Sequence, residues 1–136
     1  MDPKFRVSIP TDFRPAAGVK LFLLFAETHA MPVVRVINQM DYDRRVQIVQ
    51  ESDLMPARKN AILGSLAMRC REVSINDQGK LLVPKDLSDK AGIKADATVI
   101  IAGRQSYFEV WSQENFDRVL EIEQAHSDEA QLGIYD

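Results

Sequence analysis

The chain has 136 residues, of which 46% are hydrophobic and 27% charged, and its net charge at pH 7 is −3. This length and apolar content suit one compact domain or two intimate half-domains. No apolar run approaches the ~20 residues of a membrane-spanning helix, and the segment MDPKFRVSIP lacks the apolar stretch of a signal peptide. Cys70 is the only cysteine, which excludes an intramolecular disulfide. These features favour the cytoplasm and predict no membrane partner.

The charge is unevenly distributed along the chain. Residues 114–136 contain seven acidic residues and one base, Arg118, so this segment carries −6 and residues 1–113 carry +3. A modestly basic body with an acidic C-terminal segment can still hold phosphate on one face. The overall negative charge therefore does not exclude nucleic acid as a partner.

Two segments of the chain resemble each other at a fixed spacing of 74 residues. Residues 6–20 read RVSIPTDFRPAAGVK, and residues 80–94 read KLLVPKDLSDKAGIK. The spacing continues downstream, where Val36 and Arg44 correspond to Val110 and Arg118. Two copies of a small module are too few for a solenoid. We therefore expect them to pack against each other as one pseudo-symmetric unit.

The first copy reads as a short strand, a turn, a hairpin and a helix. Pro10 ends the first strand, because proline suits only the edge or end of a strand. Gly18 ends the turn as a left-handed cap, and Asn38 is a credible helix N-cap. The expected elements are a strand at 5–9, a turn or short helix at 11–17, hairpin strands at 20–25 and 32–37, and a helix at 39–50.

A helical insertion separates the copies, and the second copy then repeats the order of elements. Residues 51–53 break the first helix, and Ser52 is expected to cap a second helix at 56–69, whose apolar residues form a stripe. Gly92 and Ser112 take the places of Gly18 and Asn38. The remaining expected elements are strands at 73–75, 79–83, 97–102 and 107–111, a turn or short helix at 85–91, and a helix at 113–126, followed by a frayed end.

The most suggestive chemistry lies where each copy begins. Asp2 precedes Arg6 by four residues, and Asn76 precedes Lys80 by four. A short acid or amide in a turn bonds nearby backbone N–H groups and fixes the loop. An arginine so presented can bind phosphate or a guanine edge through two parallel bonds, whereas lysine offers a point charge. Two symmetry-related nucleic-acid contacts and two solvated turn charges both remain open on spacing alone.

The runs DPKFRVSIPTDFR and NDQGKLLVPKDLSDKAGI resemble the two D-x-x-x-R-centred modules of MraZ proteins, which belong to the SpoVT/AbrB-like group. The run AGRQSYFEVWSQENFDRV resembles the passage from strand to helix in the same family. The resemblance covers nearly the whole chain. It implies an α+β fold in which two tandem swapped-hairpin β modules form a pseudo-two-fold β core with flanking helices. The implied division is module one at 1–41, a helical insertion at 42–69, module two at 70–116, and a C-terminal helix with an acidic tail at 117–136.

The resemblance also implies a function. Members of the family regulate transcription of the division and cell-wall gene cluster, bind short direct repeats of double-stranded DNA upstream of their own operon, and assemble into homo-oligomeric rings. It implies a nucleoid-associated protein that is not an enzyme, with no cofactor and no small-molecule substrate. The family's motifs carry over onto Lys4 and Arg6 in the first module and Lys80 in the second. The residues implied to shape the two loops are Asp2, Asn76 and Gly79.

The chain departs from the family pattern at the start of both modules. Phe5 stands where the first loop usually has glycine, which restricts its backbone. Asn76 and Lys80 replace aspartate and arginine, which predicts a weaker or less base-selective second contact. The chain also begins at the first motif, where the family has a leading strand. We therefore expect an asymmetric reader whose first module carries more of the specificity.

Other polar residues give weaker signals. Arg14 and Lys85 are further candidates for phosphate contacts, with solvated surface charge as the alternative. Cys70 is expected to be a buried thiol, and His29 and His126 have no ligand-spaced neighbours, so we expect no metal site. No motif indicates catalysis. The methionines expected to serve in packing are Met31, Met40, Met55 and Met68.

Two rival classes of function remain. The first is an antitoxin-like or interaction protein that docks its partner on the helical insertion. The second is an oligomeric scaffold that has lost DNA binding, which the substitutions at Phe5, Asn76 and Lys80 make conceivable.

Overall fold

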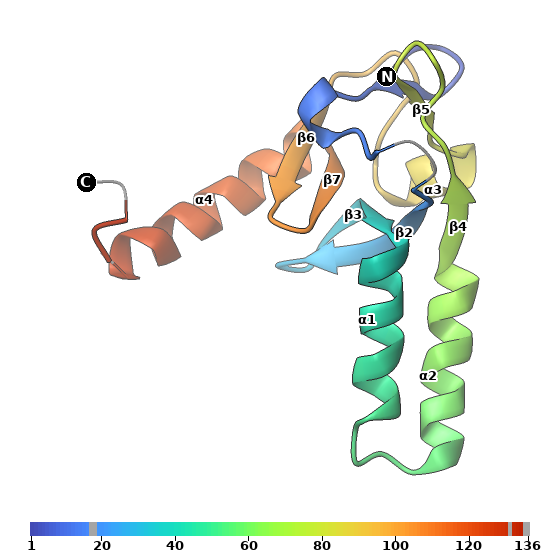
Figure 1. Cartoon of the computed structure of the whole chain (residues 1–136). Coiled ribbons are helices and arrows are strands. Elements are labelled where there is room, and N and C mark those ends of the chain that lie inside the picture. The colour runs from blue at the N-terminus through green and yellow to red at the C-terminus, as the bar shows by residue number, and fades with distance from the viewer. Residues whose placement is uncertain (17–18, 131, 135–136) are drawn as a thin grey trace.

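The computed structural model describes residues 1–16, 19–130 and 132–134. These residues form antiparallel sheets and four α-helices, which confirms the α+β class. No helix among them is long and apolar enough to cross a membrane. The elements, labelled in Figure 1, are β1 Arg6–Ser8, the 3₁₀ turn η1 Thr11–Phe13, β2 Leu21–Thr28, β3 Met31–Asn38, α1 Gln39–Gln50, α2 Pro56–Arg69, β4 Cys70–Val73, β5 Lys80–Leu82, α3 Lys85–Lys90, β6 Val99–Arg104, β7 Tyr107–Ser112 and α4 Gln113–Ala130.

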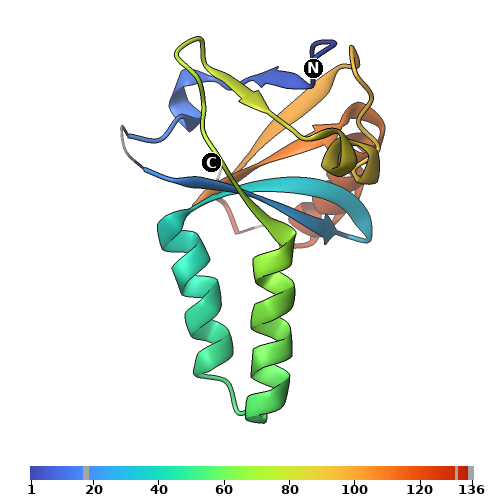
Figure 2. The same ribbon diagram turned by 90° about the vertical axis from the view of Figure 1, so that its right-hand side faces the viewer.

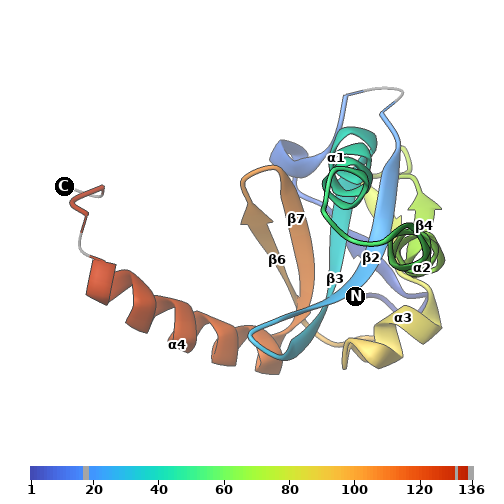
Figure 3. The same ribbon diagram turned by 90° about the horizontal axis from the view of Figure 1, so that it is seen from below.

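The strands form two sheets that lie one above the other. The larger has five strands in the order β4-β2-β3-β7-β6, and the smaller is the ribbon of β1 and β5. Figure 2 shows the ribbon above the larger sheet and the α1–α2 hairpin projecting from the opposite side. Helix α4 leads away from the body of the molecule, as Figure 3 shows from below.

The pairing of strands follows an approximate two-fold axis that relates residues 74 apart. Val7 pairs with Leu81 in the ribbon, and Arg35 pairs with Glu109 at the centre of the larger sheet. Strands β2 and β6, the first strands of the two hairpins, depart from this spacing. Leu21 of β2 pairs with Asn38, and Val99 of β6 pairs with Ser112, so corresponding residues of β2 and β6 are 78 apart. The first copy therefore reaches its hairpin by a connection four residues shorter than that of the second copy.

The core is divided between the two faces of the larger sheet. Alternate residues of a strand point to opposite faces, so Val34 and Val36 face the ribbon while Val33 and Trp111 face α4. Trp111 is fully buried. Each large apolar side chain so buried stabilises the fold by about 1.5–3 kcal/mol.

A buried carboxylate sits at the centre of the larger sheet. Glu109 has no exposed surface, and its oxygens accept hydrogen bonds from Arg35 Nε (3.1 Å), Arg104 Nε (2.7 Å) and Trp111 Nε1 (3.1 Å). Arg104 continues to Glu123 of α4 (2.7 Å). A buried charge is tolerated only when it is paired and hydrogen-bonded. This network therefore ties both hairpins and α4 to one point.

Several expected elements differ from the structure. The strand expected at 73–75 is β4, Cys70–Val73. Ser52 does not cap the second helix, since its hydroxyl donates to the carbonyl of Val49 (2.6 Å) and α2 begins at Pro56 without a side-chain cap. Three of the methionines expected to serve in packing are instead exposed, on or beside the helical hairpin: Met40, Met55 and Met68.

The short helix expected in the first copy is also reduced. Only Thr11–Phe13 form a turn, and Arg14 is extended, with φ −78° and ψ 135°. Pro15 explains this, because a residue that precedes proline is excluded from the helical region. The second copy has Asp89 at the corresponding position and forms the full helix α3. The glycine cap expected at Gly18 lies outside the described residues, whereas Gly92 does adopt the left-handed conformation, with φ 73°.

We predict that Glu109→Gln lowers the free energy of unfolding by about 2–3 kcal/mol, because it leaves the partly buried Arg35 without its charged partner and leaves Arg104 with Glu123 alone. Urea denaturation followed by circular dichroism would measure this change. Glu114→Gln removes an exposed carboxylate paired with Arg118 and should cost less than about 0.5 kcal/mol. Equal effects of the two substitutions would contradict the central role of Glu109.

Candidate nucleic-acid interface

The two opening loops, residues 2–6 (the first loop) and 76–80 (the second loop), are built alike. Oδ1 of Asp2 accepts hydrogen bonds from the backbone N–H groups of Lys4 and Arg6, both at 2.9 Å. Oδ1 of Asn76 accepts from those of Gln78 (3.0 Å) and Lys80 (2.9 Å). An amide oxygen therefore replaces the carboxylate without loss of the turn.

Each loop is also fixed by the opposite half of the molecule. The N–H of Ile9 donates to the carbonyl of Gly79, and the N–H of Val83 donates to the carbonyl of Phe5, both at 2.9 Å. Phe5 and Gly79 both have positive φ, at 61° and 76°. The turn thus requires a left-handed residue at this position, which glycine adopts without cost and phenylalanine does not. Both loops stand at the top of Figure 2, on the side away from the α1–α2 hairpin.

The basic side chains of the two loops are held differently. Arg6 Nε pairs with Asp2 Oδ2 at 2.8 Å, and its side chain is 40% exposed. Its two terminal nitrogens make no hydrogen bond to the described part of the chain. Lys80 Nζ donates to the hydroxyl of Ser8 on the neighbouring strand. Arg6 therefore presents an oriented fork, and Lys80 presents a single donor.

The charge of Asp2 depends on this loop geometry. The backbone N–H of Arg6 holds the pKa of the Asp2 carboxyl below its usual range, with further help from the Arg6 side chain and the N–H of Lys4. The group remains ionised wherever the protein is folded near neutral pH. Its negative charge orients Arg6 and partly offsets its positive charge.

Arg14 has a structural position that spacing did not reveal. Its Nε donates to the carbonyl of Ile9 (2.8 Å), and its guanidinium lies over Gly79, where a Cβ would overlap it. At the symmetry-related positions, Ser88 corresponds to Arg14 and Phe5 corresponds to Gly79. The loop residue is therefore the smaller of the pair in the second loop and the larger in the first. Arg14 therefore fixes the second loop, and its exposed end lies beside that loop.

The remaining candidate, Lys85, lies on α3 and pairs with Asp89 (3.1 Å). Sequence reasoning missed an ion pair in which the two terminal guanidinium nitrogens of Arg71 donate to Asp86, one of them at 2.7 Å. Arg71 lowers the pKa of Asp86 to about 2. No local spacing predicts this pair, because it joins β4 to α3.

Three residues could suggest catalysis or metal binding: Cys70, His29 and His126. Cys70 is half-buried, and burial raises the pKa of its thiol, which makes it a poor nucleophile. The rings of His29 and His126 stack with centroids 6.2 Å apart, although the sequence places them far from each other. Within the ranges that the structure describes, no three metal-binding side chains gather in one place.

Comparison with known proteins matches this architecture to one family. The family described as "MraZ protein, putative antitoxin-like" matches residues 66–132. The chain is 24% identical over 136 residues to "Transcriptional regulator MraZ" of Rickettsia rickettsii (strain Sheila Smith), covering 98% of this chain and 90% of the relative. It is 25% identical over 117 residues to the protein of that name from Mycoplasmopsis pulmonis (strain UAB CTIP), covering 86% and 76%.

These matches define the class as a transcriptional regulator of a non-enzymatic family. The chain belongs to the MraZ family. The resemblance drawn from the two loop motifs and the C-terminal run is thereby confirmed, and so is the expectation that the chain belongs to a non-enzymatic family.

We predict that Arg6→Gln raises the pKa of Asp2 but leaves it below the ordinary value, because the two backbone N–H donors remain. Since the folded pKa is depressed, the stabilisation of the first loop is present above the ordinary pKa and is lost as the pH falls through the folded value. Carboxyl carbon chemical shifts recorded by NMR during an acid titration would measure the midpoint. Lys4→Gln should leave it unchanged, and an equal shift in both variants would contradict the pairing with Arg6.

Proposed function

We propose that this protein is a sequence-specific, DNA-binding regulator of transcription, and that the two loops form its DNA-binding surface. The observation that carries the proposal is their shared construction. Each loop is capped by one side-chain oxygen, fixed by the opposite half of the chain, and followed by a base at the start of a strand. A solvated surface charge would not require such support at two symmetry-related places.

We propose that the two halves are AbrB-like swapped-hairpin modules, at 1–41 and 70–116, separated by the helical insertion at 42–69 and followed by the C-terminal helix and tail at 117–136. The reciprocal bonds of Ile9 and Val83 support this division. Each module is completed by a strand of the other, so the two loops are carried by one rigid ribbon.

The two loops have unequal roles in this proposal. Arg6, oriented by Asp2, offers two free terminal nitrogens to a guanine edge, which is the most frequent specific contact in the major groove. Lys80 and Lys4 contact phosphates, which supply affinity without sequence information. Arg14 keeps the second loop in place, and Lys85 is a peripheral phosphate contact. Specificity therefore lies mainly in the first loop.

The DNA that this surface fits is a set of short direct repeats upstream of the protein's own operon, in the division and cell-wall gene cluster. One protomer has few basic contacts and would bind weakly. A homo-oligomeric ring in the nucleoid would engage several repeats at once and raise the overall affinity without new contacts.

A second candidate function is a protein-interaction module of the antitoxin-like kind. The observation that favours it is the α1–α2 hairpin, where Met40, Met55 and Met68 are largely exposed. Exposed methionines suit adaptable binding of an apolar partner surface. A stoichiometric protein that co-purifies with the chain, and is lost on charge substitution at Met55, would favour this candidate.

We predict that Arg6→Ala weakens binding to the cognate repeats about 10- to 100-fold, the range expected for the loss of one bidentate base contact. Electrophoretic mobility shift at fixed salt would measure it, with circular dichroism as the control for folding. Lys59→Ala is the matched control, because Lys59 belongs to α2 in the hairpin on the side away from the two loops, and it should change affinity less than about threefold. Full affinity in a folded Arg6→Ala protein would contradict the assignment of the first loop.

We also predict that Lys80→Ala weakens binding to cognate and random DNA alike and reduces the salt dependence by about one counterion. Binding measured between about 50 and 200 mM salt would give the slope. A wild-type affinity that does not change with salt, or a Lys80→Ala loss confined to cognate DNA, would contradict the phosphate role.

A further inference from the structure

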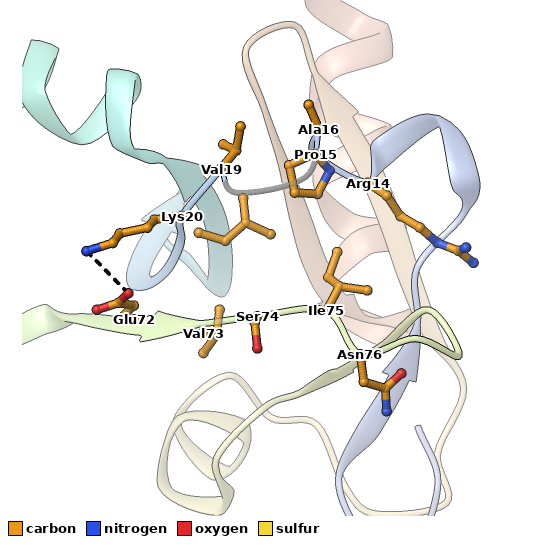
Figure 4. Close-up of a pocket in the computed structure, with 11 residues that line it drawn as sticks. Arg14, Pro15, Ala16, Val19, Lys20, Glu72, Val73, Ser74, Ile75 and Asn76 are labelled. Atoms are coloured by element: carbon orange, nitrogen blue, oxygen red, sulfur yellow. Dashed lines mark ion pairs between the residues drawn. The ribbon is translucent and has the colours of Figure 1, made fainter.

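A pocket of about 390 Å³ opens beside Asn76 of the second loop. Figure 4 shows Lys20 paired with Glu72 at one end of this pocket, at 3.7 Å. At the other end, Arg14 donates to the carbonyl of Ile9. Both of these cations are thus engaged within the chain. The pocket therefore adds little free charge to the proposed DNA interface, and the ribbon that carries the two loops offers more.

The ribbon of β1 and β5 has one buried face and one outer face. Val7 pairs with Leu81, and both side chains are buried in the core between the ribbon and the larger sheet. Alternate residues of a strand point to opposite faces. The outer face therefore carries the other four residues of the two strands: Arg6, Ser8, Lys80 and Leu82. A two-stranded ribbon of this kind, placed at the top of Figure 2, fits the major groove of DNA.

Leu82 is the apolar member of this outer face. It is 54% exposed, and it belongs to neither hydrophobic cluster of the described residues. One exposed leucine on a protein surface is ordinary and needs no explanation by itself. Its position is the informative feature, because it stands directly opposite Arg6 in the register of the ribbon. Facing residues of an antiparallel pair have their Cβ atoms about 5 Å apart, so the two side chains reach a partner together.

The two cross-strand pairs of the outer face differ in what they offer to the basic side chain. In one pair, Lys80 donates to the hydroxyl of Ser8. In the other pair, Leu82 takes the position that corresponds to Ser8, and it has no acceptor for Arg6. Leu82 therefore leaves the terminal nitrogens of Arg6 free for an external partner, whereas a hydroxyl at this position would compete for them.

The chemistry of the pair selects a combination of groups on DNA. An arginine fork binds O6 and N7 of guanine in the major groove, and an apolar side chain contacts the C5-methyl group of thymine there. Successive base pairs are stacked about 3.4 Å apart, which is comparable with the spacing of facing side chains in a ribbon. Arg6 and Leu82 therefore match a guanine and a thymine in neighbouring base pairs.

We propose that Leu82 is a specificity-determining residue that contacts the methyl group of a thymine next to the guanine bound by Arg6. The inference rests on the proposed DNA-binding function and adds a second base contact to the one assigned to the first loop. Leu82 belongs to β5 in the second half, and Arg6 belongs to β1 in the first. The ribbon thus reads two neighbouring base pairs with one residue from each half.

The test replaces thymine by deoxyuridine, which removes the methyl group and leaves base pairing unchanged. The probes are fluorescein-labelled duplexes with one direct repeat from upstream of the protein's own operon, each with a single thymine replaced. Fluorescence anisotropy at fixed salt should show a thymine, next to a guanine, at which the replacement weakens wild-type binding about fourfold. This factor corresponds to about 0.8 kcal/mol for one buried methyl group, at 1.4 kcal/mol per tenfold change.

Variants of the protein then connect this thymine to Leu82. Leu82→Ala should bind the unmodified duplex at least about fourfold more weakly than the wild type, and replacement of the sensitive thymine should have almost no further effect, because the two changes remove the same contact. Leu82→Met, which keeps an apolar side chain, should retain the sensitivity. Leu120→Ala is the matched control, since Leu120 is an exposed leucine of α4, outside the ribbon, and it should alter neither result. Circular dichroism checks that each variant is folded.

The outcomes separate this inference from the DNA function. Wild-type preference for the repeat without any sensitive thymine would overturn the inference and leave the DNA function standing. Unchanged affinity of a folded Leu82→Ala protein, or wild-type sensitivity in that variant, would do the same. Equal losses on both duplexes together with a reduced mass in light scattering would also overturn it, by identifying Leu82 as a contact between copies. Failure of the wild type to prefer the repeat over random DNA would contradict the DNA function and this inference with it.

Discussion

The structure depends on the two reciprocal backbone hydrogen bonds that join each loop to the opposite half of the chain. The N–H of Ile9 donates to the carbonyl of Gly79, and the N–H of Val83 donates to that of Phe5, so each loop is tied to the opposite half of the chain. This constraint fixes the ribbon above the larger sheet and holds both loops on one side. It also demands a left-handed residue at positions 5 and 79, and the presentation of Arg6 and Lys80 follows from it.

The same constraint explains how the two halves have diverged without loss of the fold. The groups that make the turn are kept, as Asp2 and Asn76 cap it equally. One pair of positions around it has changed: Gly79 leaves room for Arg14, and the residues at the corresponding positions are Phe5 and Ser88. Divergence has therefore altered what each loop presents more than how it is built.

Much of this could be predicted from the sequence, and the failures share a physical cause. The helix at 39–50 and its cap Asn38 were predictable because capping is local, and the two loops were found because they repeat. The strand predicted at 73–75 lies at Cys70–Val73, and Ser52 does not cap the second helix. Both predictions were wrong because tertiary pairing, and not local propensity, sets those boundaries. The Arg71–Asp86 pair joins distant elements, and no spacing indicates it.

The position of Arg35 opposite Glu109 has a consequence for which halves can pair. In a symmetric dimer of either half, a residue on the axis would meet its own copy, so the first half would bring arginine against arginine and the second would bring glutamate against glutamate. Like charges held together in a buried site are strongly unfavourable. The fused chain replaces both repulsions with one ion pair of 3.1 Å. The two halves are thus specified as partners for each other and against themselves, which favours one chain carrying both halves over separate, self-pairing halves.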